Sequence, residues 1–188
     1  MVAFKLNQEQ ELARKMFRDF AQNEVKPLVR EMDEAEAFDM ELLGKMKRYG
    51  LLGIPYGKEY GGGGAVVLTY ALCMVEMSKV DASVGITISV HTSLCCSCIS
   101  EYASEEQKQT FLRPLVDGTK VGCFGLTEPG AGTDAGGVLT TADRDGDDYV
   151  LNGQKVFTTN SGFADTFIIF ALTNKALGGV KGMSANWN

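Results

Sequence analysis

The 188-residue sequence lacks several patterns, and each absence argues against a class of protein. It has no run of basic residues and carries a net charge of −6, so we expect no nucleic-acid binding, which normally requires a basic stripe. No window shows the long uncharged apolar run of a membrane span, so we expect no membrane association. The opening residues, MVAFKLNQEQELARK, lack the apolar core of a secretion signal.

Motifs for disulfide, phosphate and calcium sites are also missing. The five cysteines form no spaced disulfide framework, because three of them crowd together at Cys95, Cys96 and Cys98. A reducing, cytoplasmic setting is therefore expected. The glycine loop at 58–64 (KEYGGGG) lacks the Gly-Lys-Ser/Thr ending of a P-loop, which favours a flexible connection. The acidic run at 143–148 (DRDGDD) lacks the spacing of a calcium loop and is expected to be a solvated turn.

The first two thirds of the chain has the periodicity of helices. Asp39 stands where an N-cap is expected, Gly50 fits the left-handed position past a helix end, and Ser104 with Gln107 forms a capping box. Pro27 is expected to end or kink the first helix. The segment 83–102 is apolar nearly all round, which predicts a helix buried inside a bundle. The predicted helices cover residues 8–32, 39–49, 66–79, 83–102 and 104–117.

After residue 120 the pattern changes to that of strands. Asn152-Gly153 is a strong hairpin signal, because both residues tolerate positive φ. Helices followed by strands predict an α+β fold, with an N-terminal all-helical bundle at 1–119 and an incomplete, antiparallel β-barrel-like domain at 120–188. The predicted strands are Lys120–Leu126, Leu139–Ala142, Tyr149–Leu151, Gln154–Thr159 and Thr166–Leu172.

The stretch Val121–Ala135 (VGCFGLTEPGAGTDA) is the first candidate site. It passes from an apolar strand through a Glu-Pro turn into a loop of glycines and hydroxyl-bearing residues. Glycines let backbone N–H groups approach a ligand closely, so the loop is a candidate ligand cradle. Taken alone, the glycine loop fits a purely structural turn equally well.

A second candidate lies on the apolar helix. His91, Cys95 and Cys98 are spaced by four and three residues, which places them on one helical face where they could ligate a metal. The alternative is a buried helix that tolerates small cysteines and carries one pocket-lining histidine. A fourth ligand is not apparent, and no metal is expected.

Several motifs in the right order resemble the acyl-CoA dehydrogenase family. FGLTEPGAGTDA, preceded by Thr119–Gly122, is similar to the family's first signature, and LNGQKVFTTNSGFAD is similar to the segment that makes its second flavin contact. EYGGGG and ITISVHTSL also match in order and spacing. The resemblance covers essentially the whole chain, and the short-chain, butyryl-type branch is the most similar.

The resemblance implies FAD as cofactor and an acyl-CoA thioester as substrate. Many relatives have Trp where Phe157 stands, and Phe keeps the stacking surface without the indole N–H. The cofactor-binding residues that it implies are Phe124, Gly125, Leu126, Thr127, Gly132, Thr133, Phe157, Thr158 and Thr159. The substrate-binding residues that it implies are Thr133, Thr87, Val90, His91 and Leu94.

The family's general base is a glutamate in a C-terminal helical domain, so we assign no catalytic residue in this chain. The resemblance therefore implies an N-terminal fragment of the enzyme, inactive on its own. Relatives are commonly tetramers that pass electrons to an electron-transferring flavoprotein. Two alternatives stay open: a non-catalytic remnant that binds flavin or CoA, and a metal-binding helical protein built on His91 and the cysteines.

Overall fold

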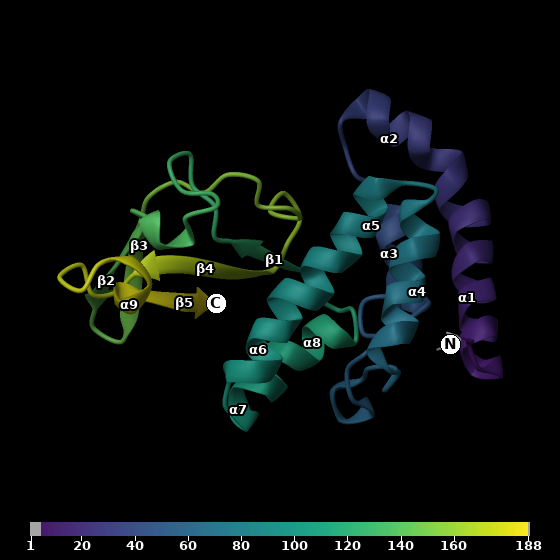
Figure 1. Ribbon diagram of the computed structural model, residues 1–188, viewed down its shortest axis with the longest axis horizontal. Coiled ribbons are helices and arrows are strands. Elements are labelled where there is room, and N and C mark those ends of the chain that lie inside the picture. Colours follow the sequence, from purple (N-terminus) through teal and green to yellow (C-terminus); the bar gives the residue numbers. More distant parts are fainter. Residues whose placement is uncertain (1–4, 188) are drawn as a thin grey trace.

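The computed structural model describes residues 5–187, so the extreme ends of the two expected domains, residues 1–4 and 188, lie outside it. The helices α1–α8 occupy one side of the molecule, and the sheet with the short helix α9 occupies the other (Figure 1). The helices are α1 Gln8–Phe20, α2 Val29–Ala35, α3 Met40–Arg48, α4 Val67–Ser78, α5 Ala82–Ser89, α6 Ser97–Tyr102, α7 Glu105–Gln107, α8 Arg113–Val116 and α9 Gly179–Gly182. The strands are β1 Gly122–Gly125, β2 Thr141–Asp145, β3 Asp148–Asn152, β4 Thr166–Leu172 and β5 Met183–Trp187.

Local sequence signals account for the helical part. Asp39 caps α3 by accepting a hydrogen bond from Leu42 N at 2.8 Å, and Ser104 and Gln107 form the expected capping box. Gly50 has φ +66°, in the left-handed region predicted for it. Pro27 does not end the helical run, but it lies where the α-helix is interrupted, as the second of its two expected effects requires. The interruption is a 3₁₀ turn that, with a π-helical turn before it, joins α1 to α2.

The centre of the helical part is a single run from Ala82 to Tyr102. It comprises α5, a π-helical segment Val90–Cys96, and α6. By length and composition this run is apolar enough to cross a membrane, so the expectation that no such window exists was wrong. Glu101 is its only Asp, Glu, Lys or Arg residue, and more than half of its most apolar window is buried inside the protein. Its burial fits the predicted core helix of the bundle.

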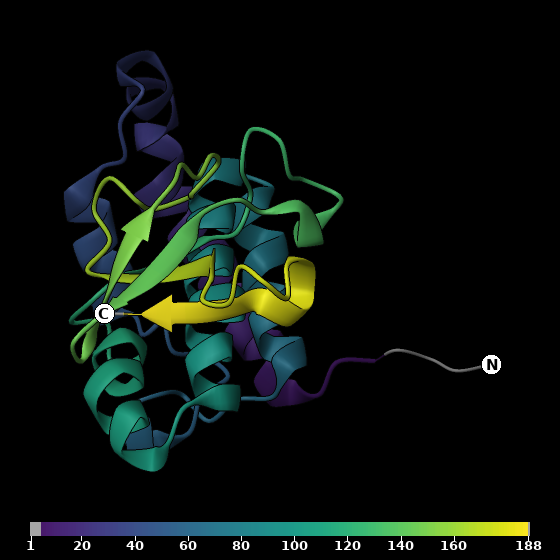
Figure 2. The same cartoon turned by 90° about the vertical axis from the view of Figure 1, so that its left-hand side faces the viewer.

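The strands form an open mixed sheet of order β1-β4-β2-β3, with β5 added against β4. β1 and β4 are parallel, with Gly122 opposite Thr166, whereas β2–β3 and β4–β5 are antiparallel. The expected β-barrel-like closure was therefore wrong, as was the purely antiparallel pairing. The long connection between β1 and β4 carries the chain back to the end at which β1 began, so both strands run in one direction. Figure 2 shows the sheet in front of the helices.

The hairpin is formed by a different turn from the one expected. β2 and β3 pair from Thr141 opposite Asn152 to Asp145 opposite Asp148, so Gly146 and Asp147 form the turn. Gly146 has φ +63°, which suits a two-residue hairpin turn. Residues 154–158 form no strand, and Gly153 is explained by packing, because a Cβ there would lie 2.3 Å from Thr140 Oγ1.

Candidate functional site

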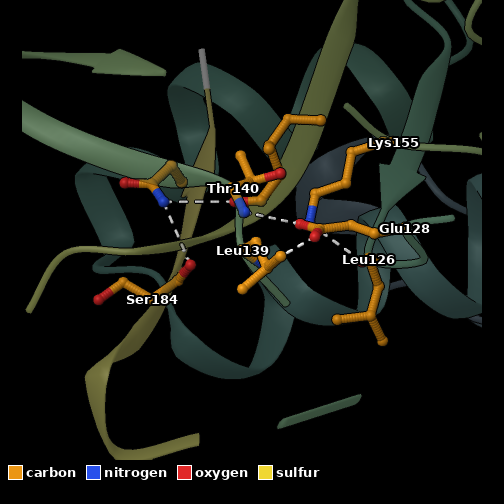
Figure 3. Close-up of polar contacts among 8 residues, drawn as sticks. Leu126, Glu128, Leu139, Thr140, Lys155 and Ser184 are labelled. Carbon is orange, nitrogen blue, oxygen red and sulfur yellow. Dashed lines mark hydrogen bonds and ion pairs between the residues drawn. The ribbon is translucent and has the colours of Figure 1, made fainter. Parts of the chain in front are cut away.

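The glycine loop that follows β1 is organised around the carboxylate of Glu128 (Figure 3). Its Oε2 accepts a hydrogen bond from Leu139 N at 2.7 Å, and its Oε1 accepts one from Thr140 N at 2.9 Å. Lys155 Nζ donates to Oε1 at 2.8 Å. The backbone of Glu128 also pairs with Ala131 in both directions. These bonds fix where the loop leaves β1 and where it rejoins β2.

Glu128 and Lys155 are nearly buried, with 7% and 10% of their side chains exposed. Burial alone raises the pKa of a carboxyl group, but the hydrogen bonds from Lys155 and the Thr140 and Leu139 amides outweigh it and lower the pKa of Glu128 to about 2. Lys155 Nζ also donates to Leu126 O at 3.0 Å. Glu128 is therefore an ionised structural anchor, and this pair fixes the segment Leu126–Glu128 against Lys155.

The same contacts bring together the two segments that the sequence resemblance connects with flavin. Val156 N donates to Thr127 O at 2.9 Å. Gly125 also lies beside the second segment, because a Cβ on it would be in ordinary contact with Lys155 Cγ at 3.4 Å and with Thr158 Oγ1 at 3.7 Å. The backbone at 124–127 and the turn at 157–159 therefore lie side by side.

The side chains around this junction offer free polar groups and open space. Within residues 5–187, the following half-exposed or exposed hydroxyls have no hydrogen-bond partner in the protein: Thr127, Thr133, Thr158 and Thr159. A Cβ built on Gly130 or Gly132 meets nothing within 4 Å, and neither glycine has positive φ. Neither packing nor backbone conformation thus requires glycine at these two positions.

The turn that carries Phe157 has an unusual backbone. Phe157 has φ +55° and Asn160 has φ +72°, and the only other non-glycine residue with positive φ in the described chain is Glu36. The side chain of Phe157 is 91% exposed, so its ring makes almost no packing contact. Asn160 is buried, and its Nδ2 donates to Thr87 O at 3.1 Å and to Gly122 O at 3.2 Å.

The remaining expected site residues differ in exposure. Phe124 does not project freely, since its ring packs against Phe170 with centroids 5.0 Å apart. Thr87 and Val90 are buried, whereas Leu94 is 39% exposed on the same helical run. The expected substrate-binding residues are therefore only partly gathered at the junction. Thr87 is joined to it through Asn160.

His91 is fully buried between the helices and the sheet. Its Nδ1 accepts a hydrogen bond from Gly122 N at 3.0 Å, and its Nε2 lies 3.5 Å from Cys96 Sγ. Burial lowers its pKa to about 4, although a backbone hydrogen bond with Leu115 opposes the shift. The imidazole is therefore neutral, and its visible role is to join the helical part to β1.

The metal-binding alternative was wrong, because His91, Cys95 and Cys98 do not lie on one regular helical face. The spacing argument assumed a regular α-helix, but residues 90–96 form a π-helical segment, and His91 meets Cys96 instead of Cys95. The described residues contain no group of three or more His, Cys, Asp or Glu side chains that could hold a metal. Burial raises the pKa of Cys95 to about 12, so this thiol is protonated.

Comparison with known proteins gives the same assignment as the motifs. Residues 7–119 match the N-terminal domain of acyl-CoA dehydrogenases, and residues 123–185 match their middle domain. The chain belongs to the acyl-CoA dehydrogenase family. A short-chain specific acyl-CoA dehydrogenase from Clostridium acetobutylicum is 55% identical over 97% of this chain, and one from Megasphaera elsdenii is 44% identical over 93%.

Solved acyl-CoA dehydrogenase structures have the same fold. Butyryl-CoA dehydrogenase from Megasphaera elsdenii superposes with a TM-score of 0.91 at 42% identity, over 100% of this chain and 50% of that one. A glutaryl-CoA dehydrogenase from Mycobacterium smegmatis, solved with FADH2, has a TM-score of 0.88 at 33% identity, over 97% of this chain and 46% of that one. The chain spans 48% and 47% of the Clostridium and Megasphaera relatives.

Sequence reasoning missed three residues that shape the candidate site of this acyl-CoA dehydrogenase family member. Glu128 entered only as part of the Glu-Pro turn, and Lys155 and Asn160 were not singled out. Lys155 carried a weak signal, as a lone cation between Val150 and Thr159. Asn160 gave none, because its partners are 38 and 73 residues away in the sequence.

Proposed function

We propose that this chain is the flavin-binding portion of an FAD-dependent acyl-CoA dehydrogenase that oxidises short-chain acyl-CoA thioesters. The observation that carries the proposal is the junction of Thr127 with Val156, which unites the two family segments in a chain 55% identical to a short-chain specific relative.

The residues at the junction fit a flavin nucleotide. A flavin ring needs hydrogen-bond donors at its polar edge, and the unpaired hydroxyls of Thr127, Thr158 and Thr159 can supply them without adding charge. An apolar ring face needs an apolar partner, and Phe157 offers an exposed aromatic one. Phosphates need close backbone approach, which the open surroundings of Gly130 and Gly132 permit.

In this proposal the chain's residues bind and orient. Leu126, Thr127, Thr158 and Thr159 hold the polar edge of the ring, Phe157 covers a face, and Gly132 with Thr133 lies against phosphate groups. When bound, FAD supplies the hydride acceptor for oxidation of the carbon–carbon bond beside the thioester carbonyl. No residue of this chain is assigned the proton abstraction, so the chain alone is expected to bind without turning over.

The short-chain substrate, the electron acceptor and the assembly are proposals of the same kind. Relatives named short-chain specific support a short acyl group, with Leu94 as the exposed candidate for lining its pocket.

A chain in a solved structure of the electron transferring flavoprotein of Acidaminococcus fermentans matches with a TM-score of 0.94 and 46% identity, over 100% of this chain and 49% of that one. That similarity supports an electron-transferring flavoprotein as the partner of the whole protein. We expect the whole protein itself to be a tetramer. Five free cysteines support a cytoplasmic setting.

One spectroscopic experiment tests the proposal. The purified chain is mixed with FAD, freed of excess ligand and examined for flavin absorption bands, and butyryl-CoA is then added without oxygen. We expect retained flavin bands that do not bleach. A colourless protein would overturn flavin binding by this chain.

The alternative is a remnant that binds flavin or CoA with no enzyme to complete. Adding the remaining half of a short-chain relative as a separate polypeptide distinguishes the two functions. Bleaching by butyryl-CoA in the mixture supports the dehydrogenase, whereas unchanged bands support the remnant.

A further inference from the structure

Asn160 occupies a position where three separate parts of the chain meet. Its own backbone ends the turn that carries Phe157, Thr158 and Thr159. Its Nδ2 donates to Thr87 O on α5 and to Gly122 O on β1. Both N–H bonds of one amide are thus used on two elements that are far apart in the sequence.

Two features mark Asn160 as an unusual residue. Its backbone is in the left-handed region, at φ +72°, which asparagine tolerates better than most residues. Its Oδ1 is buried and has no hydrogen-bond partner among the described residues. A buried acceptor left unpaired is destabilising, and such features concentrate at functional sites. Phe157, three residues earlier, shares the positive φ.

We propose that Asn160 is a positioning residue, which sets the turn Phe157–Thr159 relative to both β1 and the helix that carries Thr87. The inference rests on the proposed flavin site, because it concerns how the two walls of that site are held together. Lys155 fixes the beginning of the turn through Leu126 and Glu128, and Asn160 fixes its end. Without the second anchor, the hydroxyl of Thr158 loses its fixed place beside Gly125.

Two substitutions separate the backbone from the amide. Asn160→Gly keeps the left-handed backbone free of strain and removes both donated hydrogen bonds. Asn160→Asp keeps the shape but points a carboxylate at two carbonyl oxygens. Asn152→Asp is the matched control, since it makes the same change at an exposed position at the end of β3.

The measurements are FAD affinity by fluorescence titration, visible circular dichroism of bound FAD, thermal midpoint, and hydrogen exchange in 156–164, all on the full chain. For Asn160→Gly we expect FAD binding at least tenfold weaker, an altered visible dichroism and exchange at least tenfold faster, with the midpoint within a few degrees of wild type. Asn160→Asp should weaken FAD binding further, and Asn152→Asp should match wild type.

Unchanged FAD affinity and dichroism in Asn160→Gly would overturn the proposal, and so would a midpoint lowered by ten degrees or more, which would mark a general structural role. If the wild-type chain binds no FAD, the proposed flavin site has failed, and hydrogen exchange then decides the positioning role by itself. Exchange in 156–164 that is the same in Asn160→Gly and wild type would overturn it.

Discussion

Lys155 Nζ lies 2.8 Å from Glu128 Oε1, and both side chains are nearly buried. The pair spans 27 residues of sequence and joins the two segments of the candidate flavin site. A buried ion pair is weak support for stability as a whole, but removal of one partner leaves an uncompensated charge inside the protein. The position of the glycine loop, which contains Glu128, therefore depends on Lys155 in the other segment of the candidate site.

Lys155→Met tests this dependence. We expect the free energy of unfolding to fall by about 3 kcal/mol, because Glu128 keeps its charge and loses its cation. Urea unfolding at neutral pH measures the loss. The control is Lys175→Met, which breaks an exposed ion pair with Asp143 (side chains 56% and 53% exposed) and should cost less than about 1 kcal/mol. Equal losses in the two variants would contradict the buried-pair interpretation.

Acidification should destabilise the protein through His91. Its folded pKa is about 4 and its ordinary value is 6.5, so the unfolded chain takes up a proton first as the pH falls. The contribution of the neutral ring is complete above pH 6.5 and is lost progressively toward pH 4. We expect a loss of roughly 2 kcal/mol between pH 7 and pH 5.

His91→Gln is the control for that pH dependence, since its amide oxygen can accept the bond from Gly122 N and does not titrate. Unfolding free energies of the wild type and His91→Gln, measured by urea at pH 7, 6 and 5, should converge as the pH falls. Parallel profiles for the two proteins would show that another group causes the acid sensitivity.

Substitution by alanine should have different effects at two glycines: at Gly132 it should weaken FAD binding, and at Gly122 it should lower stability. Gly132→Ala meets no neighbour within 4 Å and needs no positive φ, so stability should stay within about 0.5 kcal/mol of wild type while FAD binding weakens. A Cβ on Gly122 would lie 2.3 Å from Cys95 Sγ, so Gly122→Ala should destabilise the protein by about 2 kcal/mol. Thermal unfolding and FAD titration measure both effects. Unimpaired FAD binding in Gly132→Ala would remove that glycine from the site.

Phe157→Ala separates binding from folding at the exposed ring. The side chain is 91% exposed, so stability should change by no more than about 0.5 kcal/mol. FAD affinity should fall at least tenfold if the ring covers the flavin. Leu177→Ala removes another exposed apolar side chain, 60% exposed, and should leave FAD binding unchanged. A Phe157→Ala protein that retains full affinity would contradict the stacking role.

Helix ends and strand β4 were predictable because their signals are local. Asp39 and Ser104 are caps that act within three residues, and Thr166–Leu172 is the strand as predicted. Strand direction was not predictable in this way. Whether β4 runs parallel or antiparallel to β1 depends on the path of about 40 intervening residues, which no short pattern encodes.

The candidate site was predictable as two sequence segments, but its supports were not. Thr127 and Thr158 belong to motifs that can be recognised in sequence. Lys155 and Asn160 act through partners distant in the chain, and a hydrogen bond between distant residues leaves no periodicity. Gly153 shows the converse error, in which a local turn signal was really a site of close packing against Thr140.

The parallel pairing of β1 with β4 has a consequence for synthesis on the ribosome. Val121 N donates a hydrogen bond to the carboxylate of Asp165, which is 44 residues later in the sequence. Strand β1 is therefore translated well before its partner strand β4 exists. Closing so long a segment is entropically unfavourable and slows sheet formation. His91 precedes β1 in the chain and already offers an acceptor to Gly122 N. The helical part can therefore retain the first strand while the rest of the sheet is still being translated.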